Sequence, residues 1–311
     1  MANAPAAPRL RAGLDENGLG PRLGPMTVTG ALLSLTAPDD VSTAAATAAG
    51  IGDSKALCAH GSMSAVERFV LAVTEVHLGY RPTSLDALLD AIGHESHADL
   101  RALCPSGEAP RQCFDSPVAL PAFGAAPDAR DRDVAQTLLD AGVRVLEVRV
   151  SLACARRLND ERTNGRSRFD LDLDAMLSIA DRFRARCLPS ELVAHCGKVG
   201  GRKSYLAALT RLHPLPELVE ETPARSAYRL RGYGEVAFVR DGDASDPAIA
   251  LASLFGKYVR ELTMERIYRY YAGRVPGLGR ASGYHDPVTT RFIQATALVR
   301  GGAIDDRCFE R

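Results

Sequence analysis

The sequence predicts an α/β protein built around a mixed β-sheet with helices on its faces. Apolar, β-branched runs flank a turn rich in glycine and proline near the start of the chain, and strand-like and helix-like segments then alternate. The chain has 311 residues, of which 46% are hydrophobic, so it can bury a sizeable core. Alternating strands and helices are typical of α/β folds.

A β-hairpin is expected first, over residues 10–36. Asp15 and Glu16 end its first strand, a loop with several glycines and prolines follows, and the apolar run Met26–Leu33 forms the returning strand. An acid pair beside a tight turn can hold a hard divalent cation, and a glycine-rich loop lets a phosphate backbone come close. An ordinary hairpin with exposed acids is the alternative.

Helical patterns come next along the chain. Ser64 and Glu67 have the spacing of a capping box, which predicts a helix that starts at Ser64. Residues 80–135 are rich in Pro, Gly, Ala and Asp, and we expect them to form an insertion over the core. Its short helical patches lie at 84–92 and 98–103.

The second half of the chain returns to alternating elements. A strand is expected at Val143–Val150 and a helix at Ala175–Arg186. The acids of Phe169–Asp174 precede this helix, where they suit its dipole and need no functional explanation. Further strands are expected at Glu191–Gly197 and within Tyr228–Arg240.

Two helices are expected towards the end of the chain, a long one at Pro247–Tyr271 and a second at Pro287–Leu298. We therefore divide the chain into a disordered tail (1–9), an α/β core (10–256) and a C-terminal helical extension (257–311).

The composition narrows the function classes only a little. The 38 basic and 38 acidic residues balance, so net charge indicates neither a nucleic acid nor a membrane as partner. No apolar run is long enough to span a membrane, and residues 1–10 do not have the pattern of a secretory signal, so a cytoplasmic location is expected. Seven cysteines without a CxxC motif indicate reduced thiols, and the spacings Cys58–His60 and Cys104–Cys113 match no standard zinc site.

Four segments, in this order, resemble the type 2 ribonuclease H family: Gly13–Pro21, Asp53–Lys55, Gly242–Arg260, and Gly283–Tyr284 followed by Arg307–Phe309. The first and third are specific, whereas the other two are weak alone. The resemblance implies a ribonuclease H-like mixed five-stranded sheet flanked by helices. It also implies a monomeric, metal-dependent endonuclease that cleaves the RNA strand of RNA–DNA hybrids, or ribonucleotides embedded in duplex DNA.

This resemblance also implies the site residues. In-line attack of water on a phosphodiester builds charge on two oxygens, and a pair of Mg²⁺ or Mn²⁺ ions held by carboxylates stabilises both. The family's carboxylates fall on Asp15, Glu16 and Asp243, and we expect Asp243 to face Asp15 across neighbouring strands. Lys55 and Lys257 fall on motif positions, where they would balance the acids or contact the scissile phosphate.

The family distinguishes RNA through the 2′-hydroxyl, with a glycine loop and a tyrosine. These functions fall on Gly18, Leu19, Gly20 and Tyr284. The family usually carries a basic residue where this chain has Leu19. Backbone contacts from the loop are therefore expected, but not a charged contact.

A more serious departure concerns the family's third carboxylate, at the end of the strand Glu191–Gly197. Depending on the alignment, Cys196 or Gly197 stands there, and neither is an acid. One hypothesis is that Asp241 supplies the missing oxygen, because it shares a face with Asp243 if the segment is extended. The alternative function is a catalytically impaired homologue that binds hybrids without cutting them.

A rival reading comes from Gly197–Ser204. This segment matches the P-loop pattern of nucleotide-binding proteins except at Arg202, where the pattern requires glycine. An arginine there would crowd the phosphate, so a nucleotide phosphatase is the weaker hypothesis.

Overall fold

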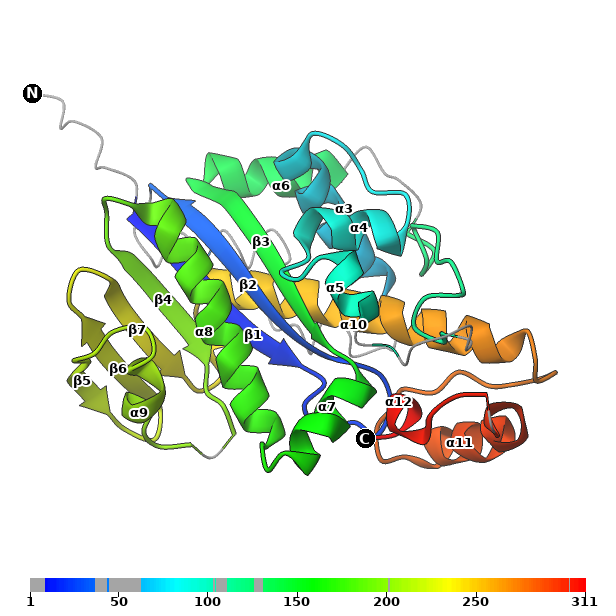
Figure 1. The fold of residues 1–311 in the computed structure, drawn as a ribbon. Helices are drawn as coiled ribbons and strands as arrows, with labels where there is room; N and C mark the ends of the chain where they lie inside the picture. Colours follow the sequence, from blue (N-terminus) through cyan, green and yellow to red (C-terminus); the bar gives the residue numbers. More distant parts are fainter. Residues whose placement is uncertain are drawn as a thin grey trace, which may run out of the picture.

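The computed structural model describes residues 9–36, 44, 63–102, 104, 111–125, 131–200, 202–301 and 303–311. Its centre is one sheet of seven strands in the order β3-β2-β1-β4-β7-β6-β5 (Figure 1). The strands are β1 (Arg9–Asn17), β2 (Met26–Leu35), β3 (Val143–Ala153), β4 (Leu192–Gly197), β5 (Glu217–Glu221), β6 (Arg225–Leu230) and β7 (Gly234–Val239). The expected α/β class is confirmed, with seven strands in place of five.

The sheet is mixed, and its parallel part positions the site. β1 pairs with β2 and β2 with β3 in antiparallel fashion, whereas β1, β4 and β7 run parallel to one another. β6 and β5 continue antiparallel beyond β7, so the range Tyr228–Arg240 holds parts of two strands instead of one. Because β1, β4 and β7 are parallel, their carboxyl ends meet at the same edge of the sheet.

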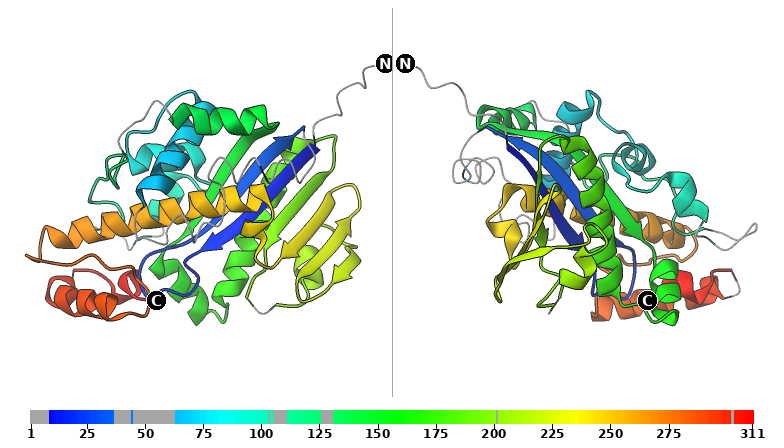
Figure 2. Two further views of the ribbon diagram at one scale, coloured as in Figure 1. Left: turned by 180° about the vertical axis from the view of Figure 1, so that it is seen from behind. Right: turned by 60° about the vertical axis from the view of Figure 1, so that its left-hand side comes forward.

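Helices cover both faces of the sheet. Helix α8 (Arg168–Cys187) lies over one face and α10 (Pro247–Ala272) crosses the other, as Figures 1 and 2 show from opposite sides. α10 approaches β1 so closely that a Cβ atom on Gly13 would lie 2.0 Å from the carbonyl carbon of Ala248. The remaining helices are α3 (Ser64–Leu78), α4 (Leu85–Ile92), α5 (His97–Ala102), α6 (Asp131–Asp140), α7 (Ala155–Thr163), α9 (Leu206–Leu209), α11 (Pro287–Arg300) and α12 (Asp306–Phe309).

The helix expected to start at Ser64 is confirmed as α3, but the capping box expected there is wrong. Met63 is the N-cap of α3 and makes no side-chain capping bond. Glu67 is instead fully buried, where it accepts hydrogen bonds from three backbone N–H groups of residues 122–125 and from the hydroxyl of Tyr258. Tertiary contacts therefore override the local pattern.

Two further segments differ from expectation. Residues 80–135 contribute to the core as well as covering it, because Leu85, Leu88 and Val118 are buried in the cluster formed with α3 and α10. Helix α8 begins at Arg168, with Ser167 and Asp170 forming a capping box. The acids of 169–174 therefore lie within the helix and not before it.

The C-terminal part packs around the end of α10. Tyr271 makes edge contacts with Phe292 of α11 and Phe309 of α12. The boundary expected between residues 256 and 257 falls inside α10, which continues from the sheet into this cluster. Among the described residues, no helix is both long enough and apolar enough to cross a membrane.

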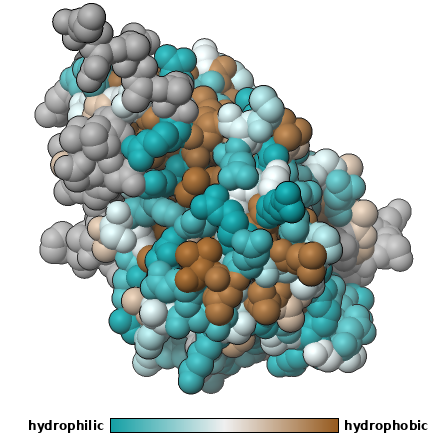
Figure 3. All heavy atoms as spheres, turned by 90° about the vertical axis from the view of Figure 1, so that its left-hand side faces the viewer, coloured by the Kyte–Doolittle hydropathy of each residue, from teal (hydrophilic) through white to brown (hydrophobic). Residues whose placement is uncertain are grey.

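Strand β5 forms one edge of the sheet, and β3 forms the other. Leu218 and Val219 on this strand are 56% and 54% exposed. Figure 3 views the molecule from this side, where apolar spots lie scattered within a largely hydrophilic surface.

Candidate active site

An open cleft of about 570 Å³ lies where the carboxyl ends of β1, β4 and β7 meet. The loops after these strands and one side of α10 form its walls. Its lining includes the predicted residues Asp15, Glu16, Gly18, Leu19, Gly20, Asp241, Asp243, Lys257 and Tyr284. Of the predicted site residues, Lys55 lies outside the described part of the chain.

The acids of β1 stand in an unfavourable electrostatic environment. Burial raises the pKa of Asp15 well above its usual range, the charges of Glu16 and Asp243 raise it further, and a hydrogen bond with Ser253 of α10 lowers it. Burial also raises the pKa of Glu16 to about 7, with Asp243 contributing. The three acids therefore act on one another, although β4 lies between β1, which carries Asp15, and β7, after which the chain reaches Asp243.

The end of β4 carries no acid in this cleft. Gly197 lines it, and a Cβ atom on Gly197 would lie 2.6 Å from Oδ1 of Asp15. Cys196 is fully buried on the α8 side of the sheet, and burial raises the pKa of its thiol strongly. Gly197 is thus the position from which a third carboxylate would reach Asp15.

The extended segment expected around Asp241 and Asp243 is not present. Asp241 adopts a left-handed conformation with φ of 52°, and Gly242–Ala244 form a short 3₁₀ helix. The side chain of Asp241 is 74% exposed and lies 3.8 Å from Nε of Arg240. The geometric reason for assigning Asp241 as the replacement ligand is therefore wrong.

Two arginines bind backbone carbonyl oxygens of the glycine loop. Arg311 donates to the carbonyl oxygen of Gly18 at 2.7 Å, and Arg168 of α8 donates to that of Leu19 at 3.1 Å. Burial, together with the charges of Arg168 and Arg260, lowers the pKa of Arg311 to about 9. Two guanidinium groups therefore contact the backbone of the loop, although it has no basic residue at position 19.

The two segments predicted to contact substrate are tied together. The N–H groups of Arg22 and Leu23 donate to the carbonyl oxygen of Gly283 at 2.7 and 3.1 Å. Tyr284, which follows, is 47% exposed, and the guanidinium of Arg260 lies 5.0 Å from its ring centre. The tyrosine and the glycine loop thus occupy one rim of the cleft.

One of the acids expected only to suit the helix dipole, Asp172, lies in a different environment. Asp172 of α8 is fully buried, and neither of its carboxylate oxygens has a hydrogen-bond partner. Burial raises its pKa well above the usual range, and the charges of Glu16 and Asp15 add to the effect. The sequence signal is its helical spacing with Met176, Ile179 and Phe183, all fully buried, which places position 172 on the inward stripe.

The donor set fits a hard divalent cation. Several desolvated carboxylates repel one another here, and Asp172 leaves two oxygens unsatisfied. Within the described ranges, no three His, Cys, Asp or Glu side chains stand together as a ready-made cage. Mg²⁺ does not require one, because it keeps several waters and binds through one or two carboxylates together with substrate phosphates.

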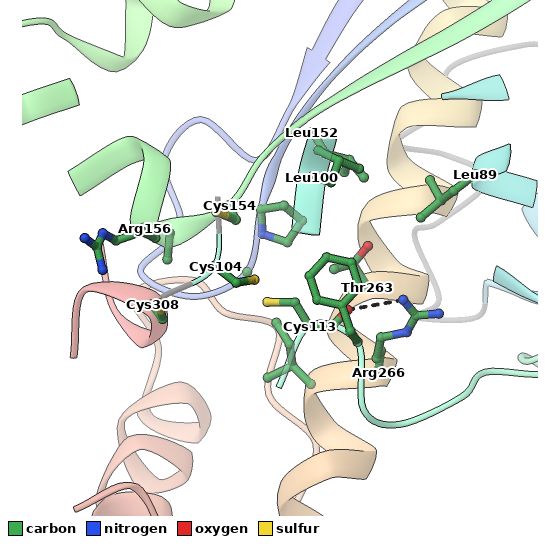
Figure 4. Close-up of a pocket in the computed structure, with 15 residues that line it drawn as sticks. Leu89, Leu100, Cys104, Cys113, Leu152, Cys154, Arg156, Thr263, Arg266 and Cys308 are labelled. Atoms are coloured by element: carbon green, nitrogen blue, oxygen red, sulfur yellow. Dashed lines mark hydrogen bonds between the residues drawn. The ribbon is translucent and has the colours of Figure 1, made fainter. Parts of the chain in front are cut away.

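A separate and smaller cavity of about 70 Å³ holds four cysteines, which Figure 4 shows around it: Cys104, Cys113, Cys154 and Cys308. Its walls are mostly apolar. Burial raises the pKa of Cys113 well above its usual range, and the neighbouring thiols add to this shift. Both Cys58 and His60 lie outside the described residues.

The P-loop alternative lacks its helix. A P-loop places the phosphate at the N-terminus of a helix that begins at its Lys-Ser pair. Here Lys203 and Ser204 are exposed, and only the single turn of α9 follows, at Leu206–Leu209.

The chain resembles known proteins in structure but not in sequence. No protein-family model matches the chain, and no curated protein matches it. Similar solved structures exist. RNase HII from Archaeoglobus fulgidus, solved as a PCNA complex, is 16% identical, with 97% of this chain and 93% of that chain covered and a TM-score of 0.42.

Two further structures are similar. The ribonuclease H2 of Pyrococcus horikoshii OT3 is 13% identical, covering 97% of this chain and 92% of that one, with a TM-score of 0.45. Bst-RNase HIII, in complex with Mn²⁺, is 13% identical, covering 98% and 66%, with a TM-score of 0.47.

Proposed function

We propose that this protein is a metal-dependent endoribonuclease of the type 2 ribonuclease H kind. Its substrate would be the RNA strand of an RNA–DNA hybrid, or a ribonucleotide embedded in duplex DNA. The observation that carries the proposal is the meeting of Asp15, Glu16 and Asp243 in one cleft, beside the glycine loop and Tyr284. These segments are far apart in the sequence, and the sequence alone predicts that each belongs to the site.

The residues of the cleft have distinct tasks in this proposal. Asp15, Glu16 and Asp243 would hold Mg²⁺ or Mn²⁺, which when bound supplies positive charge to the attacking and leaving oxygens. Lys257, from the α10 wall, would balance the charge of the scissile phosphate. Asp241 has no part in the proposal, because its side chain is largely exposed at the rim.

Recognition of the substrate would involve the rim of the cleft that the glycine loop and Tyr284 form. The glycine loop can approach the sugar closely because a Cβ atom on Gly20 would meet no atom within 4 Å, so the surface there is open. The half-exposed Tyr284 offers a ring face and a hydroxyl next to this loop. A 2′-hydroxyl, which distinguishes RNA from DNA, is the group that such a rim would contact.

The alternative function is a protein of the same fold that binds hybrids without cutting them. The glycine at position 197 is the observation that favours it, because this end of β4 contributes no carboxylate to the cleft. Loss of one ligand from a two-ion site reduces the charge available to hold the ions.

A cleavage assay separates the two functions. The substrates are a labelled RNA–DNA hybrid, a DNA duplex with one ribonucleotide and an all-DNA duplex, each with Mg²⁺ or Mn²⁺. We expect cuts only next to ribonucleotides, and a loss of at least about a hundredfold in Asp243→Asn. The matched control is Asp181→Asn, at an exposed position of α8. Tight binding without cleavage would favour the impaired homologue, and neither binding nor cleavage would contradict both functions.

A further inference from the structure

Asp172 is the least explained charged group in the described part of the molecule. Three acids alternate in the first turns of α8, and the two outer ones have evident structural partners. Asp170 caps the helix with Ser167, and Asp174 pairs with Arg211 at 2.5 Å. Asp172 lies between them, fully buried, with both carboxylate oxygens unpartnered.

The face of α8 that carries Asp172 is held against the end of β1. Arg168 lies one helical turn before Asp172 and on the same face, and it donates to the carbonyl oxygen of Leu19. The first turn of α8 therefore contacts the loop that directly follows Glu16. The charges acting on the Asp172 carboxyl are those of Glu16 and Asp15, both acidic.

This arrangement is expensive in free energy without a compensating charge. An ionised carboxylate buried without a partner costs several kcal/mol, and two further acids nearby increase the repulsion. A cation bound between Asp172 and Glu16 would satisfy the orphaned oxygens and reduce the repulsion. Oxygen-only donors of this kind favour Mg²⁺ and Mn²⁺ over softer metals.

We infer that Asp172 compensates for the carboxylate that β4 lacks, as an oxygen donor that joins Glu16 in binding a divalent ion. The compensating carboxylate comes from the helix on the α8 face of the sheet, whereas Gly197 leaves the space beside Asp15 without a side chain. The inference rests on the proposed function, because that function supplies the metal ion.

The test measures metal binding and not cleavage. Mn²⁺ is titrated into the full chain, with calorimetry and the electron paramagnetic resonance signal of free Mn²⁺ as readouts. Asp172→Asn keeps the shape of the side chain and removes its charge, and Asp181→Asn, exposed on the same helix, is the matched control. We expect Asp172→Asn to weaken Mn²⁺ binding about tenfold or more and Asp181→Asn to leave it unchanged.

Thermal unfolding provides a second readout that a merely structural role would not produce. Without metal, Asp172→Asn should melt at the same temperature as the wild type or higher, because a buried unpartnered charge is gone. With Mn²⁺, the wild type should gain stability and the variant should gain much less. A variant that binds Mn²⁺ as the wild type does, with the same gain, would overturn the inference.

The outcomes distinguish the inference from the proposed function. A wild type that cleaves hybrids together with a fully metal-competent Asp172→Asn overturns the inference alone. A wild type that binds Mn²⁺ through Asp172 but cuts no hybrid overturns the proposed nuclease and supports the inference. A wild type that binds no Mn²⁺ overturns both.

Discussion

Gly197 stands directly against the carboxylate of Asp15: a Cβ atom on the glycine would lie 2.6 Å from Oδ1 of the acid. The contact joins the ends of β4 and β1, where the sequence resemblance expects a third acid. A side chain at position 197 would cause little steric strain, because the atom that must move is Oδ1 of Asp15, at the end of a side chain, and not a backbone atom. An acid introduced at 197 would therefore point at the group with which it should share a metal ion.

The first prediction follows from this contact. Gly197→Asp should destabilise the metal-free protein by about 1–2 kcal/mol, because another carboxylate enters a cluster of desolvated acids. Mn²⁺ should reverse this loss, and hybrid cleavage should rise about tenfold, which corresponds to about 1.4 kcal/mol of transition-state stabilisation. Unfolding with and without Mn²⁺ and a single-turnover cleavage assay measure both effects.

Gly197→Asn is the control for that variant, because it adds the same bulk without the charge. It should show the steric cost but neither the rescue by Mn²⁺ nor the gain in rate. Equal behaviour of the two variants would mean that this position is unrelated to metal binding.

The elements with strong local patterns were predictable from the sequence. The first hairpin and α10 are examples, because alternating or helical apolar positions and Gly/Pro punctuation define them within the segment itself. The range Tyr228–Arg240 is expected to contain one strand but holds β7 and the end of β6, because the tight turn between them carries only a weak signal. Gly242–Ala244 turned out helical, because a left-handed residue at Asp241 ends the extended chain.

Residues that depend on tertiary contacts could not be assigned in the same way. Glu67 fits a capping box locally, but backbone donors from 122–125 and Tyr258 draw it inward. Asp172 lies on the buried stripe of α8 because the helix begins at Arg168, earlier than the sequence pattern indicates. The sequence shows the acid but not the side of the helix that carries it.

A pH dependence is expected for the metal-free protein. Burial raises the pKa of Glu16 from 4.5 to about 7, so the folded state holds this proton more tightly than the unfolded chain does. The resulting stability is present below about pH 4.5 and is lost as the pH rises through about 7, a loss on the order of 2–3 kcal/mol. Urea unfolding between pH 4.5 and 8 in the presence of a chelator measures it.

The variant Glu16→Gln tests the assignment of that slope. Its stability should fall less steeply between pH 5 and 8 than that of the wild type, and the slope that remains belongs to Asp15 and Asp172, whose pKa values burial also raises. If the full slope persists in Glu16→Gln, another group causes it.

Glu67 should be a stability residue without a role in the cleft. Its carboxylate accepts from the N–H groups of Phe123 and Ala125 at 2.8 and 3.2 Å and from Tyr258 at 2.9 Å. Glu67→Ala leaves these donors without an acceptor and should cost about 3 kcal/mol or more in the free energy of unfolding. Glu75 lies on the same helix as Glu67, and Glu75→Gln, which breaks a partly exposed pair with Arg81 beyond the helix end, should cost less than about 1 kcal/mol.

The last prediction concerns the missing charge at Leu19. Arg168 and Arg311 bind carbonyl oxygens of the glycine loop from behind, so their charge reaches a bound phosphate only at a distance. Leu19→Arg places a guanidinium on the cleft side and should tighten hybrid binding, with the slope of log K against log salt steeper by about 0.9 for one added phosphate contact. Leu19→Gln loses the same apolar packing without gaining charge, and its salt slope should equal that of the wild type. An unchanged slope in Leu19→Arg would mean that the substrate backbone does not pass along this rim.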